Sequence, residues 1–304
     1  MVWLSGLLPY GQAEQVFERI GGLHLPDATI WRHVEKHGER LKQYVEAEQS
    51  QVSPERILLA DARQDHDTPK GVSLDGGMVN IREEGWKEFK AGVVYSIGQR
   101  TGVDPQTGET MDLPCAEQSR YTAVLGDVDQ FAPALWAIAV EHDLPRAARS
   151  SVAADGAEWI WNLATDLFPD STQIVDWYHA THHLALAAHA LFPQDETQAL
   201  DWYRHMQTPL FRGEIWKITR PLQQASLADH ARYFEHHQRR MHYQDFREEG
   251  FLIGSGPVES EIKQYKVRLS GPGMRWARPN AERLLVIRSA VLSHQFDALW
   301  AAAA

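Results

Sequence analysis

The alternation of strand-like and helix-like segments between residues 71 and 192 constrains the fold of this chain more than any other feature. A strand-like segment around Leu74 comes first, followed by two segments rich in valine, tyrosine and threonine, and short apolar strands then alternate with helical segments. The strand-like segments are 71–81, 90–98, 119–126, 149–155 and 171–177, and the helix-like segments are 127–144, 156–168 and 177–192. This β-β-β-α-β-α-β-α order predicts an α/β fold with a mixed sheet whose later strands are parallel.

The regions on either side of these segments are predicted to be helical. Residues 12–47 contain two helical runs around a short glycine-containing turn, a pattern found in helix-turn-helix units and in many other helical hairpins. Asp27 is the predicted N-cap of the second run. Residues 190–248 contain no strand-like run, so they predict an all-helical insertion. A final helical region closes the chain.

Composition narrows the class of protein. Of the 304 residues, 43% are hydrophobic, which is enough for a substantial core and excludes a wholly disordered chain. The single cysteine, Cys115, excludes an intrachain disulfide and a cysteine-based zinc finger. The start, "MVWLSGLLPYGQAE", lacks the basic flank of a signal peptide, and no apolar run reaches the ~20 residues of a membrane span. We therefore expect a cytoplasmic protein.

The charge is distributed unevenly. The net charge of −11 argues against a protein that binds nucleic acid over its whole surface. Between residues 259 and 288, however, seven basic residues stand against three acidic ones, which is a local excess of four positive charges. Such a segment is either a solvated helix face or a patch that contacts phosphates. Five of its basic residues are candidates for phosphate contacts: Lys263, Lys266, Arg268, Arg275 and Arg278.

Two aspartates occupy unusual positions in the predicted strands. Asp75 lies within an apolar strand, and Asp155 ends the strand "SVAAD". An acid in such a place is costly unless it is paired, hydrogen-bonded or bound to a cation. Because a right-handed crossover commonly places the fourth strand parallel to the first, about 4.8 Å away, the two carboxylates are expected side by side. Taken singly, each aspartate also suits a turn or a helix cap.

A third acid, Glu259, follows the sharp "GSGP" approach to a predicted helix, in which Pro257 suits the first turn. Lys263 and Lys266 follow it at i+4 and i+7, on the same side of that helix. A carboxylate aimed at a metal, with cations behind it for a phosphodiester, explains this arrangement. An acidic first turn favoured by the helix dipole explains it equally well.

The chemistry of these three acids favours magnesium or manganese over zinc, because all the ligands are oxygens. Two such ions would support phosphodiester hydrolysis followed by strand transfer. A zinc hydrolase built on His179, His182 and His183 is an alternative, although no HExxH motif is present. A glycosidase with paired carboxylates gains no support from the basic helix after Glu259.

Four stretches carry a resemblance to a known family. The stretches are "SLDGGMV", "VAADGAEWIW", "DWYHATHHL" and "GSGPVESEIKQYKVRLSGPGMRW". Together they resemble the motif blocks of bacterial insertion-sequence transposases of the ISKra type, which are related to Mutator-like transposases. The resemblance covers residues 70–300 and, less specifically, the helical start.

The resemblance implies an RNase H-like mixed sheet with helices on both faces and a DDE triad of Asp75, Asp155 and Glu259 that binds two Mg²⁺ or Mn²⁺ ions. Mutator-like enzymes also place an acid or cysteine, two residues and then a histidine after the second catalytic aspartate, and here Asp176 and His179 match that motif. We expect Asp176 to cap the helix and His179, in its first turn, to contact a phosphate or shuttle a proton. The implied divisions are a helix-turn-helix-like segment (1–50), a linker (51–70), the first part of the core (71–189), an all-α insertion before the catalytic glutamate (190–248) and the final core helices (249–304).

The function implied is that of a DNA transposase that cuts and joins DNA at the ends of an insertion sequence. Its partners would be transposon-end DNA, target DNA and further copies of the chain, and it would associate with the nucleoid when bound to DNA. Relatives usually carry more sequence upstream of the helix-turn-helix region. A shortened, non-catalytic DNA-binding remnant is therefore the second hypothesis, and the zinc hydrolase is the third.

Overall fold

The computed structural model describes residues 1–51, 67–103, 108–254 and 256–303, and for Val258, Glu259 and Glu261 it describes the backbone alone. Most of the predicted 51–70 linker therefore lies outside the described residues. The centre of the molecule is a sheet in the order β3-β2-β1-β4-β5. Its strands are β1 (Lys70–Ile81), β2 (Gly85–Val103), β3 (Thr110–Val124), β4 (Ser150–Ala154) and β5 (Thr172–Val175).

The strands run parallel or antiparallel to their neighbours as the predicted element order requires. The first three strands form an antiparallel meander, whereas β4 pairs parallel with β1 and β5 pairs parallel with β4. The prediction of an α/β fold with a mixed sheet, parallel at its later end, is therefore confirmed. This is the RNase H-like order that the resemblance implied.

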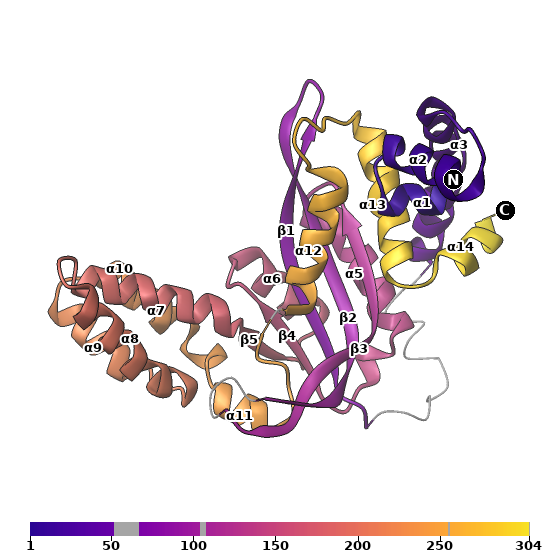
Figure 1. Cartoon of the computed structure of the whole chain (residues 1–304). Helices are drawn as coiled ribbons and strands as arrows, with labels where there is room; N and C mark the ends of the chain where they lie inside the picture. Colours follow the sequence, from indigo (N-terminus) through magenta and orange to yellow (C-terminus); the bar gives the residue numbers. More distant parts are fainter. Residues whose placement is uncertain (52–66, 104–107, 255, 304) are drawn as a thin grey trace.

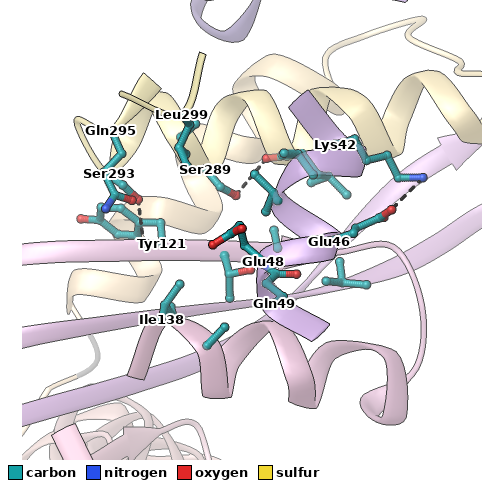
Figure 2. A pocket seen from close by; sticks show the side chains of 18 of the residues that line it. Lys42, Glu46, Glu48, Gln49, Tyr121, Ile138, Ser289, Ser293, Gln295 and Leu299 are labelled. Atoms are coloured by element: carbon teal, nitrogen blue, oxygen red, sulfur yellow. Dashed lines mark hydrogen bonds and ion pairs between the residues drawn. The ribbon is translucent and has the colours of Figure 1, made fainter. Parts of the chain in front are cut away.

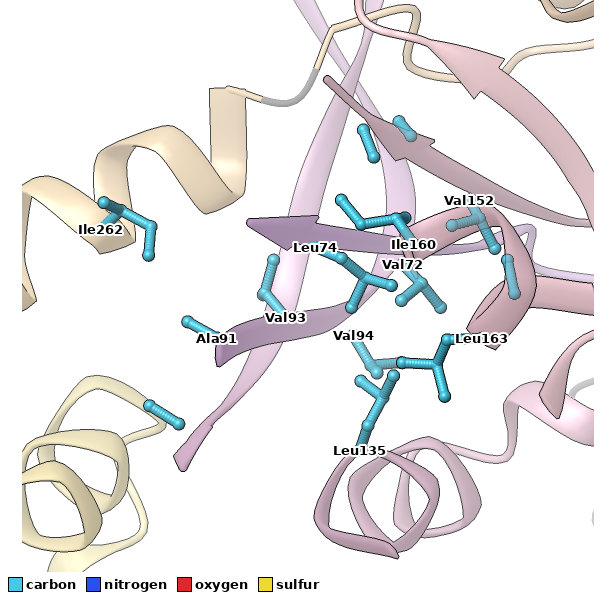
Figure 3. Packing of buried hydrophobic residues seen from close by; sticks show 14 of the residues in the cluster. Val72, Leu74, Ala91, Val93, Val94, Leu135, Val152, Ile160, Leu163 and Ile262 are labelled. Carbon is cyan, nitrogen blue, oxygen red and sulfur yellow. The ribbon is translucent and has the colours of Figure 1, made fainter. Parts of the chain in front are cut away.

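Helices cover both faces of the sheet (Figure 1). Successive residues of β2 point to opposite faces, so Val94 meets Leu135 on one side while Ala91 and Val93 face Ile262 on the other (Figure 3). The helices that pack here are α5 (Val128–Glu141), α6 (Glu158–Leu167), α12 (Gly256–Leu269) and α13 (Arg278–Leu292), and the short turn η1 (Leu144–Arg146) precedes β4. A cluster of buried aliphatic and aromatic side chains on these elements forms the core.

The N-terminal helices pack against the end of the chain. They are α1 (Val2–Leu7), α2 (Tyr10–Gly21) and α3 (Asp27–Ser50), and they lie beside α13 and α14 (Phe296–Ala303) (Figure 1). A Cβ at Gly6 would lie only 2.9 Å from Ile287, so glycine permits the close approach of α1 to α13. The prediction that Asp27 caps α3 is wrong. Pro26 is the N-cap, and Asp27 is the first residue of the helix.

The predicted insertion is helical throughout. Its elements are α8 (Glu196–Phe211), α9 (Trp216–Gln224), α10 (Ala228–His237), η2 (Gln238–Arg240) and α11 (Tyr243–Glu248). Together with α7 (Trp177–Leu191), helices α8, α9 and α10 project from the sheet as an arm (Figure 1). None of the described helices is both long and apolar enough to cross a membrane.

Candidate active site

Two carboxylates lie at neighbouring positions on the two central parallel strands. Leu74 of β1 pairs with Ala154 of β4, so Asp75 and Asp155 each follow a residue of the same pair. Asp75 still belongs to β1 and pairs with Ala91 of β2, whereas Asp155 begins the loop after β4. The strand adjacency on which the sequence argument depended is therefore present.

Backbone N–H groups orient both carboxylates. The N–H of Gly76 donates to Oδ1 of Asp75 over 2.6 Å, and the N–H of Ala157 donates to Oδ1 of Asp155 over 2.9 Å. Gly156, between the last two residues, has φ of +108°, which L side chains rarely adopt. The turn that presents Asp155 thus requires glycine, and both acids are held by short local contacts.

The electrostatic environment of Asp75 opposes its ionisation. Burial raises the pKa of this carboxyl most, and the negative charge of Asp155 raises it further, while the Gly76 N–H, Lys266 and His179 act in the opposite direction. Lys266 and His179 are therefore close enough to interact with the same centre. Two carboxylates that repel each other in a partly buried place form a site that a divalent cation would stabilise.

Asp176 and His179 stand beside this pair. The N–H of Asp176 donates to the carbonyl of Ala154 over 2.7 Å, which places Asp176 next to the end of β4. Its side chain is fully buried and its Oδ1 accepts from the N–H of His179 over 2.8 Å, so Asp176 is the N-cap of α7 as predicted. Nδ1 of His179 lies 3.4 Å from the same oxygen, and 41% of the His179 side chain is exposed. Asp176 thus caps the helix turn that carries this partly open imidazole.

Glu259 lies in the first turn of α12, but its side chain is outside the described residues. The approach to this helix does pass the site. The N–H of Trp177 donates to the carbonyl of Ile253 over 2.9 Å, and a Cβ at Gly254 would lie 3.5 Å from Oδ2 of Asp176. The third position of the triad therefore stays a prediction, on a helix whose preceding residues contact Asp176.

The histidines of α7 do not assemble a zinc site. His182 is exposed, while the ring of His183 stacks on Tyr233 of α10 with centroids 3.6 Å apart. No group of three or more His, Cys, Asp or Glu side chains within the described residues is arranged to hold a metal ion. His179, His182 and His183 are all described, so this geometry gives the zinc hypothesis no support.

The predicted phosphate-contacting residues have different environments. Lys263, Lys266 and Arg275 are exposed, and Arg278 makes a two-pronged ion pair with Glu84 (3.0 and 2.6 Å). The prediction for Arg268 is wrong, because this side chain lies on the buried face of α12.

Arg268 joins α12 to the N-terminal helices instead. It is 1% exposed and donates through Nε to the carbonyl of Ser5 over 2.6 Å. Its guanidinium lies 5.2 Å from the ring centroids of both Tyr10 and Trp276. Arg268 follows Tyr265 by three residues, and both point inward, whereas Lys263 and Lys266 point outward.

Two residues of the insertion reach the site and were not predicted from the sequence. A Cβ at Gly156, beside Asp155, would lie 3.4 Å from Nε2 of His237 and 3.9 Å from the ring of Tyr233. Both rings belong to α10, more than 70 residues further along the chain. The spacing of Tyr233 and His237, at i and i+4, places both rings on one face of the helix and could have indicated a shared site. The same spacing is also common in helices that only pack against a neighbour.

A separate cavity lies away from these carboxylates. It has a volume of about 610 Å³ and opens between α3, β3, α5 and α13 (Figure 2). Lys42, Glu46, Tyr121 and Ile138 are among its lining residues. Neither Asp75 nor Asp155 lines it, so the cavity is separate from the carboxylate pair described above.

No family model and no curated protein matches the chain. Among solved structures, the chain is similar to the Drosophila P element transposase strand transfer complex, with 11% sequence identity over 94% of this chain and 83% of that chain. The TM-score is 0.24, and a likeness this distant supports no inference by itself.

Proposed function

We propose that this chain is a DNA transposase related to the ISKra type, which cleaves phosphodiesters at the ends of an insertion sequence and transfers the freed strand. One observation carries the proposal: Asp75 and Asp155 follow paired residues of β1 and β4 in an RNase H-like sheet, next to Asp176 and His179. The motif blocks identified in the sequence supply the family.

The residues present fit a divalent cation. Asp75 and Asp155 offer oxygen ligands, and their mutual repulsion is the kind of strain that a cation relieves. Together with Glu259 they would hold two Mg²⁺ or Mn²⁺ ions. When bound, such ions activate water or a 3′-hydroxyl and stabilise the leaving oxygen. The Gly76 and Ala157 N–H groups fix the two aspartates in place. Asp176 caps the helix turn that carries His179, whose ring would contact a phosphate or transfer a proton.

Exposed cations on α12 and after it would hold the DNA backbone. Lys263, Lys266 and Arg275 are the exposed members of the basic segment, and Lys266 also acts on Asp75. If they contact phosphates, affinity should fall with salt, and replacing both lysines by alanine should reduce the slope of log K against log [salt] by about 2. A DNA interaction that is insensitive to salt would contradict these contacts.

The test is cleavage of the DNA that flanks the chain's own coding sequence, because the ends of an insertion sequence lie there. The parent protein should cut this DNA in Mg²⁺ at defined positions, and Asp75→Asn should abolish cutting. Asp129→Asn, an exposed aspartate of α5, is the matched control and should cut like the parent. Equal cutting by the parent and Asp75→Asn rejects the assignment. DNA binding without cutting by the parent identifies the non-catalytic remnant instead.

A further inference from the structure

The insertion brings buried polar atoms without partners to the edge of the candidate site. Within the described residues, no hydrogen bond reaches the hydroxyl of Tyr233, Nδ1 of His237 or the hydroxyl of Tyr243. His237 is 5% exposed, and Tyr243 is fully buried. Buried polar atoms are nearly always hydrogen-bonded in folded proteins, so three unsatisfied atoms within eleven consecutive residues need an explanation.

Two of the three residues lie beside Asp155, and the third, Tyr243, interacts electrostatically with Asp176. Tyr233 and His237 approach the backbone of Gly156, directly after Asp155. Burial raises the pKa of Tyr233 most, and the charges of Asp155 and Asp176 raise it further. Burial also raises the pKa of Tyr243, again with a contribution from Asp176. The two phenols are therefore neutral O–H donors in the field of the catalytic acids.

The ring of Tyr233 is held firmly. It stacks on His183 at 3.6 Å with an interplanar angle of 15°, and it meets Phe234 and His237 edge-on at 5.3 and 5.0 Å. His183 lies one helical turn after His179 on α7, so the stack joins the insertion to the helix that carries the predicted Asp-x-x-His motif. A donor on a fixed ring loses little conformational entropy when it binds, which suits a substrate contact.

An anionic oxygen is the acceptor that these observations favour. A phosphodiester oxygen held at Asp75 and Asp155 through a cation would be the nearest such group for the substrate already proposed. We propose that Tyr233 is a further catalytic residue, whose hydroxyl donates a hydrogen bond to a phosphate oxygen of the DNA at the Asp75–Asp155 centre. This inference rests on the proposed function.

The first test is Tyr233→Phe in single-turnover cleavage. The ring keeps its stack on His183, so the melting temperature should stay within about 2 °C of the parent value, while the cleavage rate should fall about 100-fold. Tyr203→Phe is the matched control, since Tyr203 is a partly buried tyrosine of α8 in the same insertion, and it should cleave at the parent rate. Cleavage by Tyr233→Phe within about twofold of the parent rate would overturn the proposal.

The second test reads the contact without relying on cleavage. Binding is measured in Ca²⁺ with DNA that carries a neutral methylphosphonate in place of the scissile phosphate, or of the end phosphate if no cut is found. The replacement should weaken DNA binding by the parent several-fold. It should leave binding by Tyr233→Phe almost unchanged, because this variant lacks the hydroxyl that would contact the phosphate. Equal weakening of both proteins rejects the contact. If only the parent responds but Asp75→Asn cleaves normally, the proposed triad fails while the Tyr233 contact stands.

Discussion

The acidic residues at the strands and the basic residues on the helices of this site differ in how the fold determines where their side chains point. Asp75 in β1 and Asp155 directly after β4 each follow a residue of the same cross-strand pair, so they lie at the same level of the sheet. The basic residues after Glu259 lie on a helix and the loop that follows it, where each side chain faces either solvent or a neighbour. Arg268 faces the N-terminal helices, and Lys263 faces solvent. Residue type and spacing were thus sufficient to place Asp75 beside Asp155 and insufficient to predict which of the bases are exposed.

The largest expected effect tests the acid half of the comparison. Asp155→Asn should reduce cleavage by about 10³-fold or more, because the amide cannot balance a cation's charge, and Asp75→Asn combined with it should add little more. Single-turnover cleavage of labelled end DNA measures both. Far-ultraviolet circular dichroism should show an unchanged fold. Two losses that multiply in the double variant would mean that the acids act separately and that their adjacency has no catalytic meaning.

Substitution of His179, which lies beside the acidic residues, is expected to have an intermediate effect on cleavage. His179→Ala should lower cleavage about 100-fold, since it removes the imidazole that lies beside Asp176 and interacts electrostatically with Asp75. Thermal unfolding should change little, because the backbone N–H that Asp176 caps is retained. His182→Ala, an exposed neighbour on α7, is the control and should keep the parent rate. A His179→Ala protein that cleaves normally would return this residue to a structural role.

A pair of arginine variants tests the base half. Arg268→Ala should lower the free energy of unfolding by about 3 kcal/mol, because it leaves a cavity between Tyr10 and Trp276. Arg275→Ala, exposed in the same segment, should change it by less than about 0.5 kcal/mol. Urea denaturation measures both. If Arg268→Ala instead weakens DNA binding at unchanged stability, this arginine faces the DNA and the packing described for α12 is incorrect.

The same contrast explains which features could be predicted from the sequence. The β-β-β-α-β-α-β-α order, the parallel pairing of β1 with β4 and the cap at Asp176 all depend on local patterns and on topological rules that hold for most sheets. The burial of Arg268 depends on Ser5 and Tyr10, which lie over 250 residues away in the chain. No local periodicity carries that information.

Tyr233 was missed for a related reason. Its approach to Gly156 depends on how α10 packs beside α7, and each helix alone shows only an ordinary mixture of aromatic and polar residues. The strand rules place acids at a sheet edge, but they do not say which face of a distant helical insertion turns toward that edge. Functional side chains contributed by insertions are therefore the part of such a site that a single sequence hides.

The smallest expected effect concerns stability and tests the repulsion between the acids directly. Burial and Asp155 raise the pKa of Asp75 in the folded protein. A raised pKa means that the folded state binds the proton more tightly, so the contribution of Asp75 is favourable below its ordinary pKa of about 4 and is lost as the pH rises through the folded value. Without metal at pH 7, the ionised carboxylate therefore opposes folding.

Asp75→Asn should consequently raise the free energy of unfolding of the metal-free protein at pH 7, and this gain should shrink as the pH approaches 4. The amide still accepts from Gly76, so the local geometry is kept. Urea denaturation in EDTA across this range measures the difference, with Asp129→Asn as the exposed control. Added Mg²⁺ should stabilise the parent more than the variant, because only the parent keeps both carboxylates. A variant that is destabilised at every pH would show that favourable contacts stabilise the Asp75 carboxylate. The acids would then have a structural role, like the buried Arg268, rather than a role in binding a cation.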